Sequence, residues 1–246
     1  MSTERKVALV TGSATGVGRA CAVRFAKLGF AVSVNYSKSE ADAQETVRLV
    51  EAEGVPALLF KATVADDSLV REMVARTTSI FGRLDVLVNN AGTTHFVPHT
   101  DLDALTDSVW DDIINVNVKG TFYATRAALP WLKLTKGNVV NITSVAGLSG
   151  QGSSIPYCAS KAALNCMTQS FARAFGPDVR VNAVAPGPIL TRWLAGREAH
   201  VAKFLEQAPL NRAADADDIA DAVLYLATGT TLTTGQVLVV DGGRTM

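Results

Sequence analysis

Short apolar runs alternate with longer helical patterns along the sequence, and this alternation most limits the possible fold. The runs are VALV, AVSV, ALLF, VLV, NVVNI, VRVNAV and QVLVV, at residues 7–10, 31–34, 57–60, 86–88, 138–142, 179–184 and 236–240. They are mostly continuous and apolar instead of alternating, as is expected of the strands of a parallel sheet covered on both faces. The pattern therefore predicts seven parallel strands.

The segments between the runs carry apolar residues at spacings of three and four, which is the helical period. Two of these segments end at Gly29 and Gly54, where glycine commonly closes a helix. Right-handed crossovers would place the helices on both faces of a twisted sheet and leave a ligand crevice at the carboxyl ends of the strands. We expect a doubly wound α/β fold of the Rossmann type.

A chain of 246 residues with 48% hydrophobic residues can bury one core of this kind. No linker, repeat or low-complexity tract divides it, so we expect a single domain over residues 1–246. Basic and acidic residues number 23 each, which leaves no net field toward nucleic acid or an anionic membrane. A small-molecule ligand is the expectation that remains.

The same sequence carries no sign of a targeting segment, a membrane span or a metal site. The apolar stretch after MSTERK is too short for a signal peptide, and no run approaches the ~18 residues of a membrane helix. The three cysteines form no disulfide framework, which suits a reducing compartment, and we expect a cytoplasmic protein. The histidines, at positions 95, 99 and 200, lack ligand spacing, so we expect no metal.

The first apolar run leads into the glycine-rich stretch TGSATGVG. Gly12 follows the predicted strand, and Gly16 and Gly18 open the next helix. Backbone amides of such a loop and helix N-terminus point to one spot, where an anionic phosphate would fit. Glycine at a strand-to-helix turn is equally explained by a need for positive φ. Taken alone, this motif favours nucleotide binding and a plain turn about equally.

Further strings follow in a fixed order: NNAG at 89–92, Ser144 thirteen residues before YCASK at 157–161, and PGPILT at 186–191. Together with TGSATGVG, and spread over the predicted strands, they resemble the short-chain dehydrogenase/reductase family along essentially the whole chain. The resemblance implies an NAD(P)-dependent oxidoreductase that interconverts a ketone or aldehyde and its alcohol by hydride transfer.

Tyr157 and Lys161 are four residues apart in an apolar-patterned helix, so their side chains share one face. A nearby ammonium favours the phenolate and so lowers the pKa of a tyrosine. With no other motif in the sequence, the simpler interpretation of this pair would be a tyrosine packed in the core and a lysine in solvent. The hydroxyl of Ser144 could bond the substrate oxygen where negative charge develops. We expect Ser144, Tyr157 and Lys161 to be catalytic, with Tyr157 as the proton donor.

The resemblance adds Asn117, in IINVNVKGTF, to the catalytic residues. Its side chain or backbone would help to hold water in a proton relay through Lys161. Asn115 could be mistaken for it, and a local helix hydrogen bond is the alternative for either asparagine.

The resemblance also implies a set of residues that hold the dinucleotide. Asn90 would brace the loop, Thr191 would hold the nicotinamide carboxamide, and Ile189 would supply a backbone contact. The full set is Gly12, Thr15, Gly16, Val17, Gly18, Asn35, Tyr36, Ser37, Lys38, Thr63, Val64, Asn90, Ala91, Gly92, Tyr157, Lys161, Pro186, Gly187, Ile189 and Thr191.

Cofactor preference depends on VNYSKSE, residues 34–40, at the end of the second predicted strand. NAD-preferring sites usually carry an acidic residue here to bind the ribose 2′-hydroxyl. This chain lacks one, so nothing repels a 2′-phosphate, and Ser37 and Lys38 could supply a donor and a positive charge. Thr15 argues the other way, because NADP-preferring relatives often carry a basic residue there, and Thr63 stands where relatives often use Asp to contact adenine. We expect NADP, with NAD possible.

Substrate choice would be made by the loops around residues 93–107, 145–156 and 188–210. The pattern most resembles 3-oxoacyl-carrier-protein reductases and related bacterial carbonyl reductases. Residues 93–110 form a segment that looks longer than its carrier-protein-reductase equivalent, which favours a modest-sized apolar ketone over an acyl thioester. Trp193, Leu194 and Phe204 would grip such a substrate or only pack the segment that covers it.

Two expectations concern what the fold does not fix. A dinucleotide-binding regulatory protein without turnover is the alternative of another class, against which the Ser144, Tyr157 and Lys161 set argues. The resemblance implies a homotetramer, in which helices near 108–131 and 157–175 and the C-terminal strand make the contacts between subunits.

Overall fold

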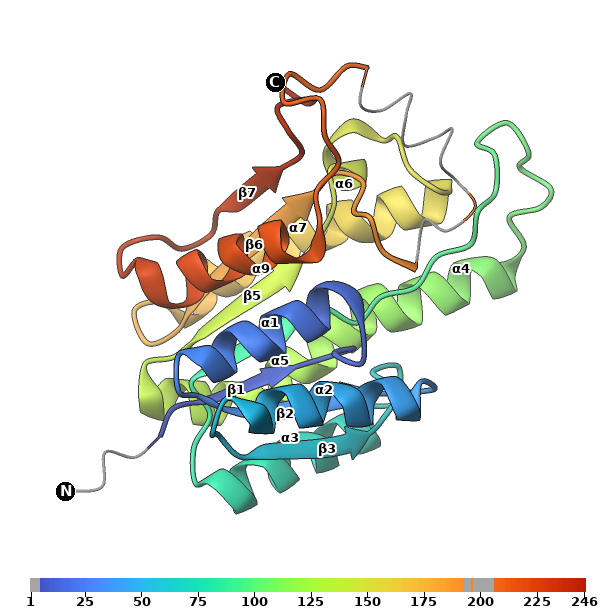
Figure 1. Cartoon of the computed structure of the whole chain (residues 1–246). Coiled ribbons are helices and arrows are strands. Elements are labelled where there is room, and N and C mark those ends of the chain that lie inside the picture. The colour runs from blue at the N-terminus through green and yellow to red at the C-terminus, as the bar shows by residue number, and fades with distance from the viewer. Residues whose placement is uncertain (1–4, 193–195, 197–205) are drawn as a thin grey trace.

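The computed structural model describes residues 5–192, 196 and 206–246 and is built on one parallel sheet (Figure 1). Its seven strands lie in the order β3-β2-β1-β4-β5-β6-β7. They are β1 (Val7–Val10), β2 (Ala31–Tyr36), β3 (Ala57–Lys61), β4 (Val86–Asn89), β5 (Asn138–Ile142), β6 (Arg180–Pro186) and β7 (Val237–Val240). Every neighbouring pair is parallel, which confirms the predicted seven-stranded, doubly wound sheet.

Helices connect the strands and cover both faces of the sheet. They are α1 (Gly16–Lys27), α2 (Glu40–Ala52), α3 (Asp67–Phe81), α4 (Asp107–Ile113), the π-helix η1 (Ile114–Lys119), α5 (Gly120–Thr135), α6 (Ala146–Ser149), α7 (Ile155–Phe175), α9 (Ala216–Leu224) and the π-helix η3 (Tyr225–Gly229). Gly29 and Gly54 follow α1 and α2 with φ of +81° and +76°, as expected for residues that end a helix.

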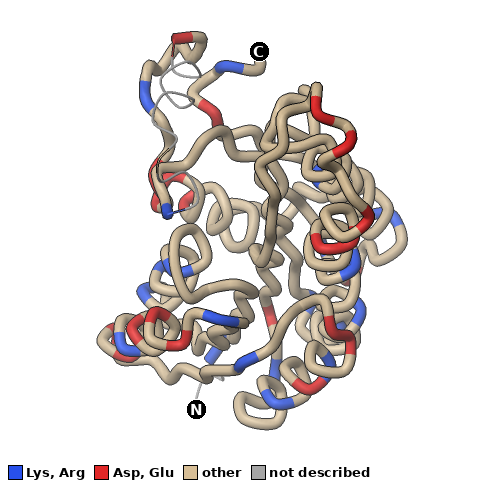
Figure 2. Tube along the Cα trace, turned by 90° about the vertical axis from the view of Figure 1, so that its right-hand side faces the viewer, with Lys and Arg blue, Asp and Glu red and all other residues tan. Residues whose placement is uncertain are grey.

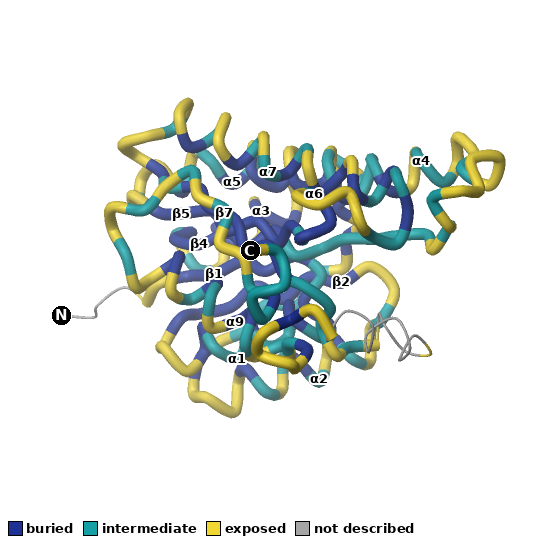
Figure 3. Tube along the Cα trace, turned by 90° about the horizontal axis from the view of Figure 1, so that it is seen from above, coloured by how far each residue is buried: buried dark blue, intermediate teal, exposed yellow. Residues whose placement is uncertain are grey.

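Successive residues of each strand enter two separate cores. Ala8 and Val10 of β1 pack with Phe25 on the face covered by α1, α2 and α9. Val7 and Leu9 pack with helices of the opposite face, which carries α3, α5 and α7. Figure 3 shows the buried sheet between exposed outer helix surfaces, and Figure 2 shows Lys, Arg, Asp and Glu mostly along those outer surfaces. Continuous apolar runs are therefore needed, because both sides of each central strand are covered.

The order of the strands fixes where a ligand crevice can form. The chain builds outward from β1 to β3 and then crosses back to place β4 on the other side of β1. The connections that leave β1 and β4 therefore diverge to opposite faces, and this is the switch point where doubly wound folds bind ligands. The glycine stretch follows β1, and NNAG begins at the last residue of β4.

Two negative findings apply to the described part of the chain. None of its helices combines the length and apolar character that a membrane crossing requires. Within the same residues, no three His, Cys, Asp or Glu side chains gather in a way that could hold a metal ion.

Candidate active site

The loop between β1 and α1 can be formed only with glycine at particular positions. Gly12 and Gly16 have φ of +62° and +56°, in the left-handed region. A Cβ on Gly12 would lie 2.8 Å from the Cα of Ala91, and one on Gly18 would lie 2.5 Å from the side-chain nitrogen of Asn90. The glycines therefore serve both the turn and a close approach to the loop after β4. Thr15 makes no side-chain cap, which leaves the first amides of α1 available to a ligand.

Three buried or half-buried polar side chains hold this loop from both sides. The Thr11 hydroxyl accepts from the backbone amides of Asn90 and Ala91, both at 3.0 Å. The Asn90 side-chain amide donates to the carbonyls of Thr11 and Gly12, both at 2.9 Å. Asn35 accepts from the Gly12 amide at 3.0 Å and donates to the Ala62 carbonyl at 3.0 Å. Asn35 and Asn90 are thus positioning residues of the glycine loop.

The residues at the end of β2 divide into two kinds. Asn35 and Tyr36 are buried, while Ser37 and Lys38 are exposed. Loss of hydration and the neighbouring Glu40 carboxylate raise the pKa of the Tyr36 phenol. Of the residues predicted to meet the adenosine ribose, Ser37 and Lys38 are therefore the ones open to a ligand.

The predicted residues after β3 and β6 reach the same crevice. Thr63 is exposed, and Val64 packs so closely that a Cβ on Gly120 would lie 2.7 Å from its side chain. Thr191, after β6, lies above the glycine loop, with its Cγ2 3.5 Å from the position of a Cβ on Gly16. Ile189 forms a single bridge with Ala214. The segment that begins with Pro186 and Gly187 therefore passes over the glycine loop at Thr191.

Ser144 and Tyr157 meet above the end of β5. Ser144 follows that strand by two residues and accepts from the Ala146 amide at 3.1 Å. Tyr157 lies in the first turn of α7, which Ser154 caps by accepting from the Tyr157 amide at 3.4 Å. Burial raises the pKa of the Tyr157 phenol to about 12, and its hydrogen bond with Ser144 acts in the opposite direction. Tyr157 is therefore a protonated phenol at neutral pH.

Lys161 is buried one helical turn beyond Tyr157. Its Nζ donates to the Ile142 carbonyl at 2.9 Å and lies 5.6 Å from the centre of the Tyr157 ring. Burial lowers the pKa of Lys161 to about 8. The sequence led us to expect that Lys161 would lower the pKa of Tyr157. In the structure the group that lowers it is the Ser144 hydroxyl, and desolvation of the buried phenol outweighs that effect.

Asn117 lies in η1 and its side chain is fully buried and bonded. Its oxygen accepts from the Thr93 amide at 2.8 Å, and its nitrogen donates to the Thr93 carbonyl at 3.0 Å and to the Ser160 hydroxyl at 2.9 Å. The sequence predicts that either the side chain or the backbone of Asn117 holds water. The side chain already bonds to Thr93 and Ser160, so the backbone is the group left for that role. A Cβ on Gly92 would lie 3.4 Å from Asn117 Oδ1 and 3.8 Å from Lys161 Nζ, so Gly92 sits close beside both residues.

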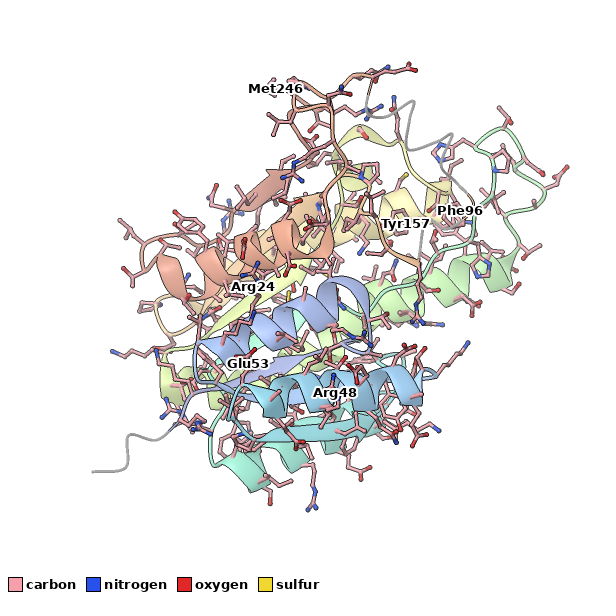
Figure 4. The ribbon with its side chains drawn as sticks, in the orientation of Figure 1. Arg24, Arg48, Glu53, Phe96, Tyr157 and Met246 are labelled. Carbon is pink, nitrogen blue, oxygen red and sulfur yellow. The ribbon has the colours of Figure 1, made fainter. Side chains whose placement is uncertain are left out.

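The mouth of the site is formed by the segment after NNAG. Thr94 and Ser153 share a hydroxyl hydrogen bond of 2.5 Å, and the Val97 amide donates to the Ser153 carbonyl at 2.9 Å. Phe96 between them is 38% exposed and lies at the same end of the molecule as Tyr157 (Figure 4). Of the residues predicted to cover the site, Trp193, Leu194 and Phe204 lie outside the described residues, as does His200.

One charged residue at the crevice was missed by sequence reasoning. Arg192 donates to the Thr15 hydroxyl at 3.0 Å and to the Asp42 carboxylate at 2.7 Å. These partners are 177 and 150 residues away along the chain. The only available signal was an arginine directly after PGPILT.

Two features of this site fit a dinucleotide. The amides at the start of α1 have no side-chain cap from Thr15, and they stand beside a loop in which Gly12 and Gly16 present no side chain to a ligand. The Lys161 ammonium and Gly92 lie together at the catalytic end of the crevice. Because Gly92 has no side chain, the nicotinamide ring and its ribose could approach Lys161 there. Asn35 and Asn90 support the glycine loop from either side, and Ser37, Lys38 and Thr63 are exposed at the ends of β2 and β3.

The chain matches known proteins over nearly its whole length. Residues 12–245 match the family model described as enoyl-(acyl carrier protein) reductase. The chain is 45% identical to the granaticin polyketide synthase ketoacyl reductase 2 of Streptomyces violaceoruber, over 98% of this chain and 96% of that protein. It is 38% identical to the 3-oxoacyl-[acyl-carrier-protein] reductase FabG of Staphylococcus aureus, over 98% of each chain.

A solved structure shows the same likeness in three dimensions. The chain superimposes with a TM-score of 0.93 on a crystal structure described as a short-chain dehydrogenase/reductase from Burkholderia xenovorans, at 36% identity and over 100% and 99% of the two chains. Fold, ordered motifs and relatives agree on one assignment. The chain belongs to the short-chain dehydrogenase/reductase family and is an oxidoreductase of that family.

Proposed function

We propose that this oxidoreductase reduces a ketone to an alcohol with NADPH as the preferred cofactor. The observation that carries the proposal is the buried Tyr157 phenol, hydrogen-bonded to Ser144 and one helical turn from Lys161. The dinucleotide, when bound, supplies the hydride. The glycine loop, Ser37, Lys38, Thr63, Ile189 and Thr191 would hold it, with Asn35 and Asn90 as supports.

Each member of the triad would have a separate task. Ser144 donates a hydrogen bond to the substrate oxygen as negative charge develops there. Tyr157 gives its proton to the same oxygen, since burial keeps the phenol protonated. Lys161 supplies positive charge near the Tyr157 ring and would bind the nicotinamide ribose. The backbone of Asn117 would hold a water that returns a proton through Lys161.

The substrate class is a 3-oxoacyl thioester in this proposal. Relatives that align over the whole chain carry the names ketoacyl reductase and 3-oxoacyl-[acyl-carrier-protein] reductase. These names favour the thioester over the free apolar ketone, which the length of residues 93–110 had favoured. Phe96 at the mouth of the site offers an apolar contact to either substrate.

A cytoplasmic location belongs to the same proposal. Cys21, Cys158 and Cys166 are free, and a reducing compartment suits them.

We also propose a homotetramer with helix and strand contacts. On the surface shared by α5 and α7, Phe122 stacks on Phe171 and Phe171 on Phe175, with ring centres 6.4 and 5.5 Å apart. On β7, Leu238 and Val239 are each 37% exposed. Light scattering at micromolar concentration should report four subunits, and a monomer would reject this assembly.

Replacing Tyr157 with Phe should abolish most reduction, because the ring is kept and only the proton donor is removed. We expect kcat/KM for ketone reduction to fall by about 100-fold or more. Tyr225→Phe is the matched control, since Tyr225 is exposed in η3 and lies outside the site. A Tyr157→Phe enzyme that binds NADPH normally and keeps most of its turnover would contradict the assigned role.

The pH profile should report Lys161. With a pKa of about 8, Lys161 carries its charge below that pH and loses it above, whereas Tyr157 stays protonated until about pH 12. Reductive kcat/KM should therefore be level below pH 8 and decline above it. Lys161→Arg, whose charge persists, should remove or delay the decline. An identical decline in both proteins would show that another group titrates.

Parallel assays with NADPH and NADH, on acetoacetyl thioesters and on free apolar ketones, test the function directly. We expect kcat/KM to be at least tenfold higher with NADPH, which is ~1.4 kcal/mol, and higher for the thioester than for the ketone. A tenfold advantage for NADH would overturn the cofactor assignment. Activity confined to free ketones would overturn the substrate class.

A further inference from the structure

We infer that Arg192 is the residue that reads the 2′-phosphate of the cofactor, in place of a basic residue within the glycine loop. The inference rests on the proposed preference for NADPH and names the group that would produce it.

Arg192 is carried to the cofactor crevice by the segment that follows β6. In Figure 1 this orange segment runs from the end of β6 toward the loop before α1. Thr191 packs beside Gly16, so the next residue is directed along the rim of the glycine loop. There one nitrogen of Arg192 meets the Thr15 hydroxyl at 3.0 Å, and another meets the Asp42 carboxylate at 2.7 Å.

Those two partners define the edge of the crevice on which Arg192 lies. Thr15 immediately precedes α1, and Asp42 is in the first turn of α2. Between β2 and α2 lies the short loop that contains Ser37 and Lys38. In a doubly wound fold, the residues after the second strand meet the 2′ position of the adenosine ribose. Arg192 therefore spans from the phosphate-facing loop to the first turn of α2, which directly follows the ribose-facing loop.

The charges around Arg192 favour an anion. Asp42 is shared by two arginines, because Arg19 also approaches it, at 3.7 Å. Arg19 is held by other acceptors, since it donates to the Ala14 carbonyl of the glycine loop at 2.7 Å and to the Thr46 hydroxyl at 2.9 Å. Glu40, at the start of α2, faces the buried Tyr36 phenol, and the exposed Lys38 adds positive charge on the open side.

Arg192 can exchange its partner for a phosphate. Its side chain is 63% exposed, and an ion pair of that kind contributes little to stability. A guanidinium binds the oxygens of a phosphate through two parallel hydrogen bonds. Asp42 thus holds the Arg192 guanidinium near the glycine loop. A 2′-phosphate, as a dianion, would be a stronger hydrogen-bond acceptor than the Asp42 carboxylate.

The test measures binding as well as turnover. Arg192→Gln removes the charge and keeps hydrogen-bonding capacity, and the dissociation constants of NADPH and NADH are measured by quenching of protein fluorescence. We expect NADPH to bind about tenfold more weakly and NADH to change by less than about twofold. Arg48→Gln is the matched control, because Arg48 is likewise an exposed arginine in an ion pair, here with Glu45 within α2 (Figure 4).

The remaining outcomes separate this inference from the proposed function. An equal loss for NADPH and NADH would show that Arg192 contacts the pyrophosphate, and no loss for either would show no phosphate contact; both overturn the inference. If the wild-type enzyme prefers NADH, the proposed cofactor preference fails instead. The inference is then decided by the fragment 2′,5′-ADP, whose binding Arg192→Gln should weaken while that of 5′-AMP is unchanged.

Discussion

The close contact between the loops that leave β1 and β4 is the constraint on which the site depends. The backbone of Gly12 lies against Ala91, and Gly18 leaves no room for a side chain beside Asn90. Because β1 and β4 are neighbours in the sheet and their connections diverge, this contact forms at the switch point of the sheet. Thr11 and Asn90 then bond across it, so the loop is held before any ligand arrives. Preorganisation of this kind reduces the entropy cost of binding a dinucleotide.

The catalytic half of the site is positioned by a second set of buried contacts. Asn89 of β4 donates to Asn141 of β5 at 2.9 Å, and Asn141 donates to Thr168 of α7 at 2.9 Å. This chain of hydrogen bonds ties α7 to the sheet below Tyr157. Nearer the site, a Cβ on Gly147 would lie 2.5 Å from the backbone carbon of Lys161, so α6 packs tightly on α7. The distance between Ser144 and Tyr157 is thus set by backbone packing and not by the two side chains alone.

The periodicity of apolar residues predicted the strands and helices well, because that periodicity is determined by which residues are buried. The seven apolar runs and the helix-ending Gly29 and Gly54 matched the structure, and the ordered motifs placed Ser144, Tyr157 and Lys161 together. What periodicity could not show is how a polar side chain chooses its partner. Asn35 turns inward to the Gly12 amide, and Arg192 reaches Thr15, because folding brings distant segments together. Neither contact leaves a trace in local spacing.

Burial has opposite effects on the two ionisable catalytic groups, and together these effects favour reduction. It disfavours the charged form of each, so the pKa of Tyr157 rises to about 12 while that of Lys161 falls to about 8. At pH 7 Tyr157 is then protonated, whereas Lys161 stays mostly charged. Reduction needs a phenol that donates, while alcohol oxidation needs a phenolate that accepts. The enzyme cannot shift the overall equilibrium, but the protonation state in which it rests is the one that reduction requires.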